Sequence, residues 1–485
     1  MESATGNSST DSLTDSSQEP LDAVLGAAAA AFPQWAAASG AERAAALQGV
    51  ADALTAEADA IVSVADAETA LGDARLRSEL TRTTFQLQMF ADLIRDGSYL
   101  EPVVVHPDDS HPVAPQPDLR RTSRPLGPVA VFAASNFPLA FSVAGTDTAS
   151  ALAAGCSVVV KAHPGHPETS QLVGRITTEA LRANGAPEGT FAVVYGFDTG
   201  PALVRHPVVR AASFTGSVAG GRALFDMAVS RPDPIPFFGE LGSLNSLVVL
   251  PTAAQARGEE IAAGLSRSVL LGGGQFCTKP GLVLLPAGEV GTALKEALAK
   301  DFRSAAPVRM LTRHVLDGFR AGREALADTP GLQLVAEGGD ATGDARPALF
   351  EVVDDTIPGI ALEECFGPAA VVATYRDSDD LLAIAAALPG ALTATVHAEA
   401  ADGELAERLV TVLEPRVGRI VFDEYPTGVS VSPAMQHGGP YPATTDVQQT
   451  SVGTAAIRRF LRPISYQNAP SYVLPAELRD RPEGS

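Results

Sequence analysis

Residues 129–161 read VAVFAASNFPLAFSVAGTDTASALAAGCSVVVK, with a short apolar run at each end. Short, continuous apolar runs are typical of strands that are buried on both faces. The Ala-rich segment between the two runs, residues 141–154, fits a helix. Strand, helix and strand in this order predict a βαβ unit of a parallel sheet that helices cover.

The same alternation continues towards the C-terminus. Apolar runs of strand length recur at residues 191–195, 211–215, 236–240, 246–250, 281–285, 370–375, 391–397 and 419–422. Segments with helical spacing, such as residues 170–183 and 220–229, lie between them, and one predicted helix ends near His206. The sequence therefore predicts an α/β fold with two lobes, each built on a parallel sheet.

The region before this alternation has a different pattern. Residues 21–96 carry apolar side chains at helical spacing, and Pro33, Gly40 and Gly72 predict breaks between helices. Residues 101–125 are rich in proline, which central strands exclude, so this segment predicts edge strands or an extended excursion.

Near the C-terminus, residues 458–467 alternate like a strand. We expect this strand and the proline-rich segment 101–125 to form a small β element.

The overall charge of the 485-residue chain argues against two classes of partner. It carries 35 Lys and Arg against 57 Asp and Glu, a net charge of −22. Nucleic acids and anionic membranes attract basic surfaces, so we expect neither as a partner.

The N-terminal sequence and the cysteines predict the compartment. Residues 1–19 are polar and Ser-rich, which predicts a disordered tail and no signal peptide. Residues 23–38 have too few Leu and Ile residues to span a bilayer. Three cysteines in so long a chain are not a disulfide framework. We therefore expect a cytoplasmic protein.

Among the three cysteines, Cys277 is the one whose surroundings suggest chemistry. Cys156 and Cys365 fit the role of small, packed apolar residues. Cys277 follows three glycines and a helical run, which places its thiol at an irregular junction where a substrate could approach the backbone closely. The local sequence leaves catalysis and simple packing equally open. No histidine lies in the motif of Cys277, which makes a plain thiol hydrolase a weaker reading.

Two further polar residues follow predicted strands. Glu240 lies between two glycines at a strand end, where loss of solvent would raise its pKa and suit it to act as a general base. A water-exposed turn is the alternative, which the local sequence slightly favours. Asn136 could donate to an oxyanion or cap a helix after Pro138, and the cap is the more common role.

A glycine-rich segment offers a phosphate site. Residues 214–221, FTGSVAGG, follow a strand and open a helix, whose free N–H groups favour anions. The segment lacks the full G-x-G-x-x-G pattern and is weak evidence alone. Lys161 lies at the carboxyl end of a strand, where open α/β sheets bind ligands.

The order of these motifs resembles the aldehyde dehydrogenase superfamily over residues 20–475. The resemblance rests on the turn at 136–138 and on Lys161, the segment 214–217, Glu240-Leu241-Gly242, Gly274-Gln275-Phe276-Cys277 and Glu364-Cys365-Phe366-Gly367-Pro368. It implies a Rossmann-like cofactor-binding domain at 20–100 and 126–240, an α/β catalytic domain at 241–445, and an oligomerisation element at 101–125 and 446–485. A homodimer or homotetramer follows by analogy.

The resemblance also implies roles for individual residues. Cys277 would attack the aldehyde, the Asn136 amide and the Cys277 N–H would hold the oxyanion, and Glu240 would activate water for thioester hydrolysis. The cofactor would be held by the residues at the remaining motif positions. These are Lys161 at the adenosine ribose, Gly216 and Ser217 at the pyrophosphate, Glu364 at the nicotinamide ribose, and Phe366 packing near it.

Within the superfamily, residues 133–154, 436–444 and 451–467 resemble the α-ketoglutaric semialdehyde (2,5-dioxopentanoate) dehydrogenase branch and its NADP-dependent fatty-aldehyde relatives. Pro164 stands where NAD-preferring relatives carry a glutamate, so the resemblance favours NADP with NAD tolerated, although the hydroxyl donor of NADP-specific relatives is also missing. No metal is expected.

For the substrate, a carboxylated aldehyde needs a cation near the tunnel. Arg75 and Arg82 share a helix face, whereas we expect at least one of the arginines at 75, 77 and 82 to be solvated. The resemblance assigns Arg82, Phe137 and His437 to the substrate tunnel, and a loop-packing role for His437 stays open. Aliphatic aldehydes are the alternative substrates, and a catalytically silent cofactor-binding protein is the alternative of another class.

Overall fold

Residues 129–161 form the middle of a five-stranded sheet. The computed structural model describes residues 20–339 and 345–480, and the predicted 1–19 tail lies outside them. The strands are β3 (Val129–Phe132), β4 (Val158–Lys161), β5 (Phe191–Val194), β6 (Ala211–Thr215) and β7 (Phe237–Glu240). They run in the order β5-β4-β3-β6-β7 and all pairs are parallel, which confirms the predicted βαβ units.

The helix between β3 and β4 is shorter than predicted. α5 (Thr146–Ala154) is buried at every residue, but residues 134–145 are irregular. The backbone N–H groups of Leu139 and Ala140 donate to the buried carboxylate of Glu79, at 2.8 and 3.0 Å. A side chain from another helix therefore satisfies the amides that a longer helix would have used. The other helices of this sheet are α6 (Pro167–Ala183), α7 (Thr199–Arg205) and α8 (Val218–Val229).

Four N-terminal helices pack on this lobe: α1 (Leu21–Ala37), α2 (Gly40–Ala56), α3 (Ala58–Thr69) and α4 (Asp73–Asp96). The break predicted at Pro33 is wrong, because α1 continues through it. Buried apolar residues on both sides of Pro33 hold the helix against the lobe, and Trp35 Nε1 donates to the Leu152 carbonyl at 3.0 Å. This packing outweighs the hydrogen bond that proline removes. The breaks near Gly40 and Gly72 are confirmed.

The second lobe holds a seven-stranded sheet. Its strands are β8 (Ser246–Val249), β9 (Leu282–Pro286), β10 (Leu332–Glu337), β11 (Ala348–Val352), β12 (Ala369–Tyr375), β13 (Ala391–His397) and β14 (Val417–Phe422), in the order β10-β11-β12-β9-β8-β13-β14. All pairs are parallel except β10 with β11. The sequence predicted neither of these two strands, since β10 mixes polar and apolar residues at the sheet edge. The helices are α9 (Pro251–Leu270), α10 (Glu289–Ser304), α11 (Arg313–Ala327), α12 (Ser378–Ala387) and α13 (Gly403–Leu413).

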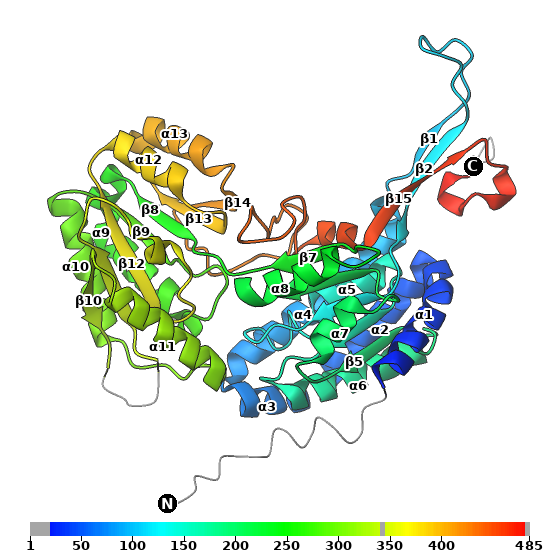
Figure 1. The fold of residues 1–485 in the computed structure, drawn as a ribbon, viewed down its shortest axis with the longest axis horizontal. Helices are drawn as coiled ribbons and strands as arrows, with labels where there is room; N and C mark the ends of the chain where they lie inside the picture. Colours follow the sequence, from blue (N-terminus) through cyan, green and yellow to red (C-terminus); the bar gives the residue numbers. More distant parts are fainter. Residues whose placement is uncertain (1–19, 340–344, 481–485) are drawn as a thin grey trace, which may run out of the picture.

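The expected small β element projects from the first lobe as an arm (Figure 1). β1 (Val103–Val105), β2 (Leu119–Pro125) and β15 (Leu461–Gln467) form an antiparallel sheet with β2 in the middle. The strand predicted from residue 458 begins only at Leu461, because residues Thr454–Phe460 form the 3₁₀ helix η6. η6 packs against α5, where the Arg459 guanidinium lies 2.5 Å from the Asp147 carboxylate and both side chains are buried.

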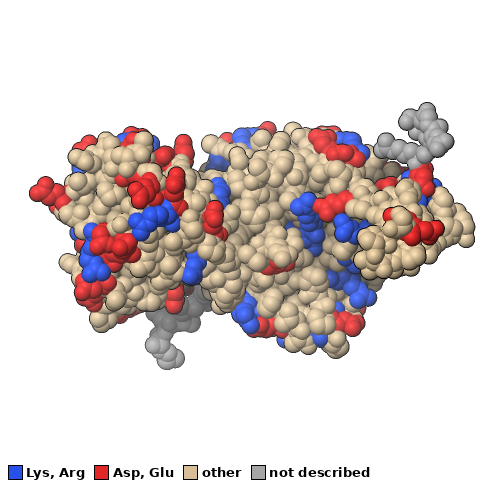
Figure 2. Space-filling model, turned by 90° about the horizontal axis from the view of Figure 1, so that it is seen from above, with Lys and Arg blue, Asp and Glu red and all other residues tan. Residues whose placement is uncertain are grey.

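Charged side chains of both signs are scattered over the face shown in Figure 2, separated by wide uncharged areas. Within residues 20–339 and 345–480, no helix is long and apolar enough to cross a membrane.

The buried pair predicts a large stability effect in the first lobe. Asp147→Ala leaves the Arg459 guanidinium buried without its charge partner, so we expect a loss of about 3–5 kcal/mol in the free energy of unfolding. Trp35 is the single tryptophan of the chain and packs on α5, so its fluorescence in a urea titration reports this lobe.

The matched control is Glu179→Ala, which removes the exposed Arg175–Glu179 pair on α6 of the same lobe. This change should cost less than about 1 kcal/mol. Equal losses for both variants would contradict a stabilising role for the buried pair.

Candidate active site

Cys277 follows a short segment with left-handed backbone, at the junction that the sequence predicted. α9 ends at Leu270, and Gly272, Gly273 and Gly274 follow with φ values of +55°, +68° and +67°. A Cβ on Gly274 would lie 2.2 Å from the Gly367 carbonyl oxygen. The glycines are therefore required by the backbone geometry and by contact with another segment. The sequence-based interpretation, that they admit the substrate, is not needed to explain them.

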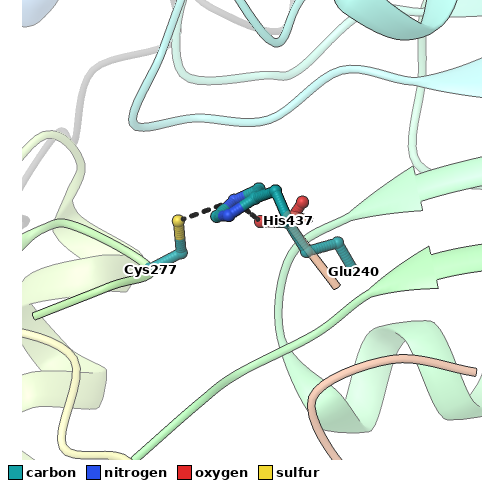
Figure 3. Close-up of side chains that lie close together, drawn as sticks. All are labelled: Glu240, Cys277 and His437. Carbon is teal, nitrogen blue, oxygen red and sulfur yellow. Dashed lines mark hydrogen bonds and ion pairs between the residues drawn. The ribbon is translucent and has the colours of Figure 1, made fainter. Parts of the chain in front are cut away.

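Two side chains from distant segments meet the Cys277 thiol (Figure 3). The Nε2 atom of His437 lies 3.6 Å from Cys277 Sγ and 2.9 Å from Glu240 Oε1. Glu240 ends β7 in the first lobe, whereas His437 belongs to the segment between β14 and η6. The structure therefore places His437 at the centre of the candidate site. The Cys277 motif contains no histidine, but the fold brings one to the thiol from a distant segment.

Glu240 is buried, with 4% of its surface exposed, so it is not the water-exposed turn residue that the local sequence favoured. Burial pushes its pKa upward, but the contact with His437 and hydrogen bonds with Ser451 and Cys277 outweigh burial and hold the pKa below its ordinary value. The expectation of a raised pKa is therefore wrong. The sequence could not show the donors that gather around the carboxylate, among them the Ser451 hydroxyl at Oε2.

The Cys277 thiol has the opposite shift. Burial and the nearby carboxylates of Glu240 and Glu364 raise its pKa well above the ordinary value, and Arg82 opposes them only in part. A group with a raised pKa keeps its proton at neutral pH. The resting side chain is therefore a thiol, and it needs a nearby acceptor such as His437 Nε2 to become a nucleophile.

Asn136 does not cap a helix, because the residues after Pro138 are irregular. Its Nδ2 atom donates to the Gln275 carbonyl at 3.0 Å, two residues before Cys277, and this bond crosses between the lobes. The amide has a second N–H, which makes no hydrogen bond to another described residue.

Aromatic rings line the same region. The Phe137 ring meets the rings of Phe276 and Phe141 edge-on, with 5.4 and 5.5 Å between ring centres. The ring centres of Phe141 and His437 are 6.3 Å apart. These rings form an apolar wall beside the cluster.

Two arginines of α4 lie on this aromatic wall. The Arg75 guanidinium is 5.3 Å from the Phe137 ring centre and donates to the Asn136 carbonyl at 2.7 Å. Arg82 lies 5.7 Å from the Phe141 ring centre and donates to the Val429 carbonyl at 2.5 Å. Arg77, on the other side of the helix, pairs with exposed Asp59 and Asp73, as expected for at least one of the three.

A third arginine, Arg419 of β14, approaches from the second lobe. It donates to the carbonyl groups of Gly428 and Pro426, at 2.9 and 2.7 Å. Arg82 and Arg419 both lie close enough to Cys277 for each guanidinium group to interact electrostatically with the Cys277 side chain. Several guanidinium nitrogens of these side chains are buried and have no hydrogen-bond partner among residues 20–339 and 345–480: Arg75 Nη1, Arg82 Nε and Nη2, and Arg419 Nε.

The residues expected at a cofactor lie around the carboxyl edge of the first sheet and across from it. Lys161 ends β4, and burial lowers its pKa. Ser217 is the N-cap of α8 and its hydroxyl accepts from Gly220 N, while both Gly216 and Ser217 are exposed to solvent. These positions leave the start of α8 open to an anion.

Glu364 lies on the opposite side, in the second lobe, with Phe366 partly buried two residues later. Burial raises the pKa of Glu364 to about 7, and Lys279 and the Ser243 N–H oppose the shift. A Cβ on Gly242 would lie 2.4 Å from Glu364 Oε2, so the carboxylate packs directly against this glycine. A carboxylate this close to the linker between the sheets fits a hydroxyl-bearing ligand bound between the lobes.

Sequence reasoning missed three polar residues of this site: Ser451, Glu79 and Arg419. Glu79 could have been found as an acid on the apolar side of the predicted helix, and Arg419 as a charge that opens an apolar strand. Ser451 has no such signal, because only the fold brings it to Glu240.

Comparison with known proteins identifies the family. The model of the aldehyde dehydrogenase family matches residues 3–449. The chain is 45% identical to α-ketoglutaric semialdehyde dehydrogenase 2 of Azospirillum brasilense, with 95% of this chain and 92% of that protein covered. It is 44% identical to α-ketoglutaric semialdehyde dehydrogenase of Acinetobacter baylyi, with 84% and 78% covered.

Solved structures show the same fold. The mutant aldehyde dehydrogenase C of Pseudomonas syringae, solved with NAD⁺ and octanal, aligns with a TM-score of 0.77 at 22% identity and covers 93% of this chain and 89% of that one. An NADP-dependent enzyme of E. coli aligns with a TM-score of 0.77 at 22% identity, with 92% and 89% covered. With its family model matched over most of its length, this chain belongs to the aldehyde dehydrogenase family.

Proposed function

We propose that this enzyme oxidises α-ketoglutaric semialdehyde (2,5-dioxopentanoate) to 2-oxoglutarate, with NADP as the preferred cofactor and NAD tolerated. The relatives at 44–45% identity carry the name of this activity. The observation that carries the proposal is the set of unpaired guanidinium nitrogens of Arg82 and Arg419, both close to Cys277, since an aldehyde with a distal carboxylate would satisfy them.

In the first half of the reaction, Cys277 acts as the nucleophile. Its thiol proton passes to His437 Nε2, 3.6 Å away, while sulfur bonds to the aldehyde carbon. The negative charge on oxygen is held by the free N–H of the Asn136 amide and by the Cys277 backbone N–H. A bound NADP would supply the acceptor for the hydride that leaves the same carbon, so that Cys277 would then carry a thioester.

In the second half, Glu240 acts as the base. Its low pKa keeps it ionised, and the Ser451 hydroxyl holds one oxygen of its carboxylate. Glu240 takes a proton from water, the resulting hydroxide adds to the thioester, and the C–S bond breaks to give the acid. The Cys277 sulfur takes back the proton held by His437, and the Glu240 carboxyl releases its proton to solvent.

The arginines argue for a carboxylated substrate. Arg82 reaches the site from α4 and Arg419 from β14, so the two guanidinium groups could hold one carboxylate from opposite lobes. A buried N–H without a partner costs free energy, which a ligand carboxylate would recover. Phe137 and His437 would contact the carbon chain between the carboxylate and the aldehyde.

The cofactor proposal rests on residues 161–166. Pro164 brings no carboxylate to repel a 2′-phosphate. His163 is neutral, because burial and the nearby charges of His166, Lys161 and His314 lower its pKa to about 3. Gly165 N donates to its Nδ1 at 3.0 Å, so Nε2 carries the hydrogen and can donate to a phosphate. Lys161 adds a positive charge at the same strand end.

The remaining cofactor contacts follow from the open positions. Gly216 and Ser217 would hold the pyrophosphate at the start of α8, Glu364 the nicotinamide ribose, and Phe366 would pack beside it. Residues 20–100 and 126–240 would then be the cofactor-binding domain, and residues 241–445 the catalytic domain.

The assembly and the compartment are further parts of the proposal. We infer a cytoplasmic homodimer or homotetramer joined through residues 101–125 and 446–485. Val103 and Val104 on the edge strand β1 are exposed, as are Tyr472 and Val473 near the C-terminus, and a second copy would cover such apolar surface.

Aliphatic aldehydes are a second candidate substrate class. The wall of Phe137, Phe141 and Phe276 is apolar and could receive an alkyl chain. The two classes differ in whether the arginines contribute to binding, which the second experiment below measures.

The first test follows reduced-nicotinamide absorbance with purified protein, NADP or NAD, and either 2,5-dioxopentanoate or hexanal. We expect turnover with NADP that is faster for 2,5-dioxopentanoate and is abolished in Cys277→Ala. Glu240→Gln should release one equivalent of reduced cofactor and then stall, because the thioester is no longer hydrolysed. Turnover with hexanal alone would overturn the substrate, and no turnover with any aldehyde would favour the silent cofactor-binding protein.

The second test concerns the arginines. Arg82→Gln and Arg419→Gln should each raise KM for 2,5-dioxopentanoate by about 10- to 100-fold, which corresponds to a lost charge-assisted hydrogen bond of about 1.5–3 kcal/mol. KM for hexanal should stay within about threefold, since an alkyl chain makes no such bond. The control is Arg77→Gln on the exposed side of α4, which should change neither value. Equal effects on both aldehydes would assign the arginines to structure.

The third test uses pH. The pKa of Glu364 is about 7, so the carboxyl group is protonated below pH 7 and ionised above it. Only the ionised form accepts hydrogen bonds from both ribose hydroxyls. We therefore expect KM for NADP to fall as pH rises through 7, and Glu364→Gln to remove this dependence. A profile that is unchanged in the variant would exclude Glu364 as its source.

A further inference from the structure

Three side chains at the candidate active site differ in chemistry but lie close together: the thiol of Cys277, the imidazole of His437 and the carboxylate of Glu240. One potential ligand atom from each lies within 4.8 Å of the other two. Glu240 and His437 are buried, and Cys277 is partly buried. We propose that these residues form an inhibitory binding site for a soft or borderline divalent transition-metal ion, of which Zn²⁺ is the best match.

The distances support a tetrahedral ion. With a Zn–S bond of about 2.3 Å and a Zn–N bond of about 2.0–2.1 Å, tetrahedral ligands place sulfur and nitrogen about 3.6 Å apart. The Sγ–Nε2 separation between Cys277 and His437 is 3.6 Å. This pair can therefore bind the ion without moving apart, and the carboxylate is the group that must adjust.

The carboxylate has the freedom to do so. Glu240 Oε1 lies 2.9 Å from His437 Nε2, slightly less than the separation of about 3.3 Å in a tetrahedral site. The contact lacks hydrogen-bond geometry, and no other described residue donates to this buried oxygen. The second oxygen, Oε2, accepts from the Ser451 hydroxyl, which holds the carboxylate from behind as partners of metal ligands usually do.

The ligand types select the ion. Thiolate and imidazole prefer zinc and similar ions over Mg²⁺ or Ca²⁺, which prefer oxygen ligands. Three protein ligands leave a fourth position for water. Binding replaces the thiol proton of Cys277 with the ion and releases that proton to solvent. The nearby guanidinium groups of Arg82 and Arg419 disfavour a cation, so two anionic ligands are needed to outweigh them.

The consequence for activity is direct. The ion would occupy the sulfur that attacks the aldehyde and the carboxylate that activates water, so it inhibits the enzyme. The site depends on His437 reaching both residues, and it is therefore a property of this arrangement and not of a catalytic cysteine in general.

Isothermal titration of Zn²⁺ into the reduced, chelator-treated full-length protein tests the proposal. We expect one ion per chain and loss of activity that a chelator reverses. Cys277→Ala and His437→Ala should each weaken zinc binding by more than about tenfold. Substitution of a residue that only hydrogen-bonds to a metal ligand can already weaken binding by about that much. Cys365→Ser, which removes the other partly buried thiol, should leave zinc affinity unchanged.

A spectroscopic measurement keeps the test independent of variants that fold poorly. Co²⁺ bound through Cys277 should give a thiolate-to-metal absorption band in the Cys365→Ser protein, and prior alkylation of Cys277 should remove it. Zinc binding that survives in Cys277→Ala or His437→Ala would overturn the proposal. The absence of both zinc binding and the cobalt band at up to about 1 mM metal would also overturn it.

Discussion

The candidate site depends on a short pairing between β7 and the segment that follows β14. Leu241 N donates to the Ala443 carbonyl at 2.7 Å, Thr445 N donates to the Gly239 carbonyl at 3.0 Å, and Glu240 pairs with Thr444 as an isolated antiparallel bridge. This pairing fixes the end of β7 against a stretch more than 200 residues further along the chain. Because backbone hydrogen bonds set the register, they also set which side chains face Glu240.

The same segment is held from its other side by the second lobe. Gly439 has a φ of +154°, and a Cβ at this position would lie 2.3 Å from the Ala391 carbonyl oxygen at the start of β13. Backbone therefore packs directly on backbone, which only glycine permits. His437, two residues earlier, is consequently held between the lobes, where it reaches a carboxylate from one and a thiol from the other.

The pKa values of Cys277 and Glu240 are shifted in opposite directions at this junction. Burial and two carboxylates raise the pKa of Cys277, while His437 and hydrogen bonds hold the pKa of Glu240 below its ordinary value in spite of its burial. The result is a protonated thiol beside an ionised base, with the Arg82 and Arg419 guanidinium groups close to the thiol. His437 lies between the thiol and the carboxylate, as the proposed transfer of the thiol proton to its Nε2 requires, and the same three side chains are the ligands proposed for a thiophilic ion.

The sequence by itself determined the local elements and the family resemblance. Apolar runs of strand length are buried on both faces whatever the connections, so β3, β4 and β6 could be predicted, and Cys277 could be placed after a helix end. The tertiary structure decided the continuation of α1 through Pro33, the donors around Glu240, and the approach of His437, Ser451 and Arg419. These features depend on contacts between residues up to 211 positions apart, and periodicity carries no information about such contacts.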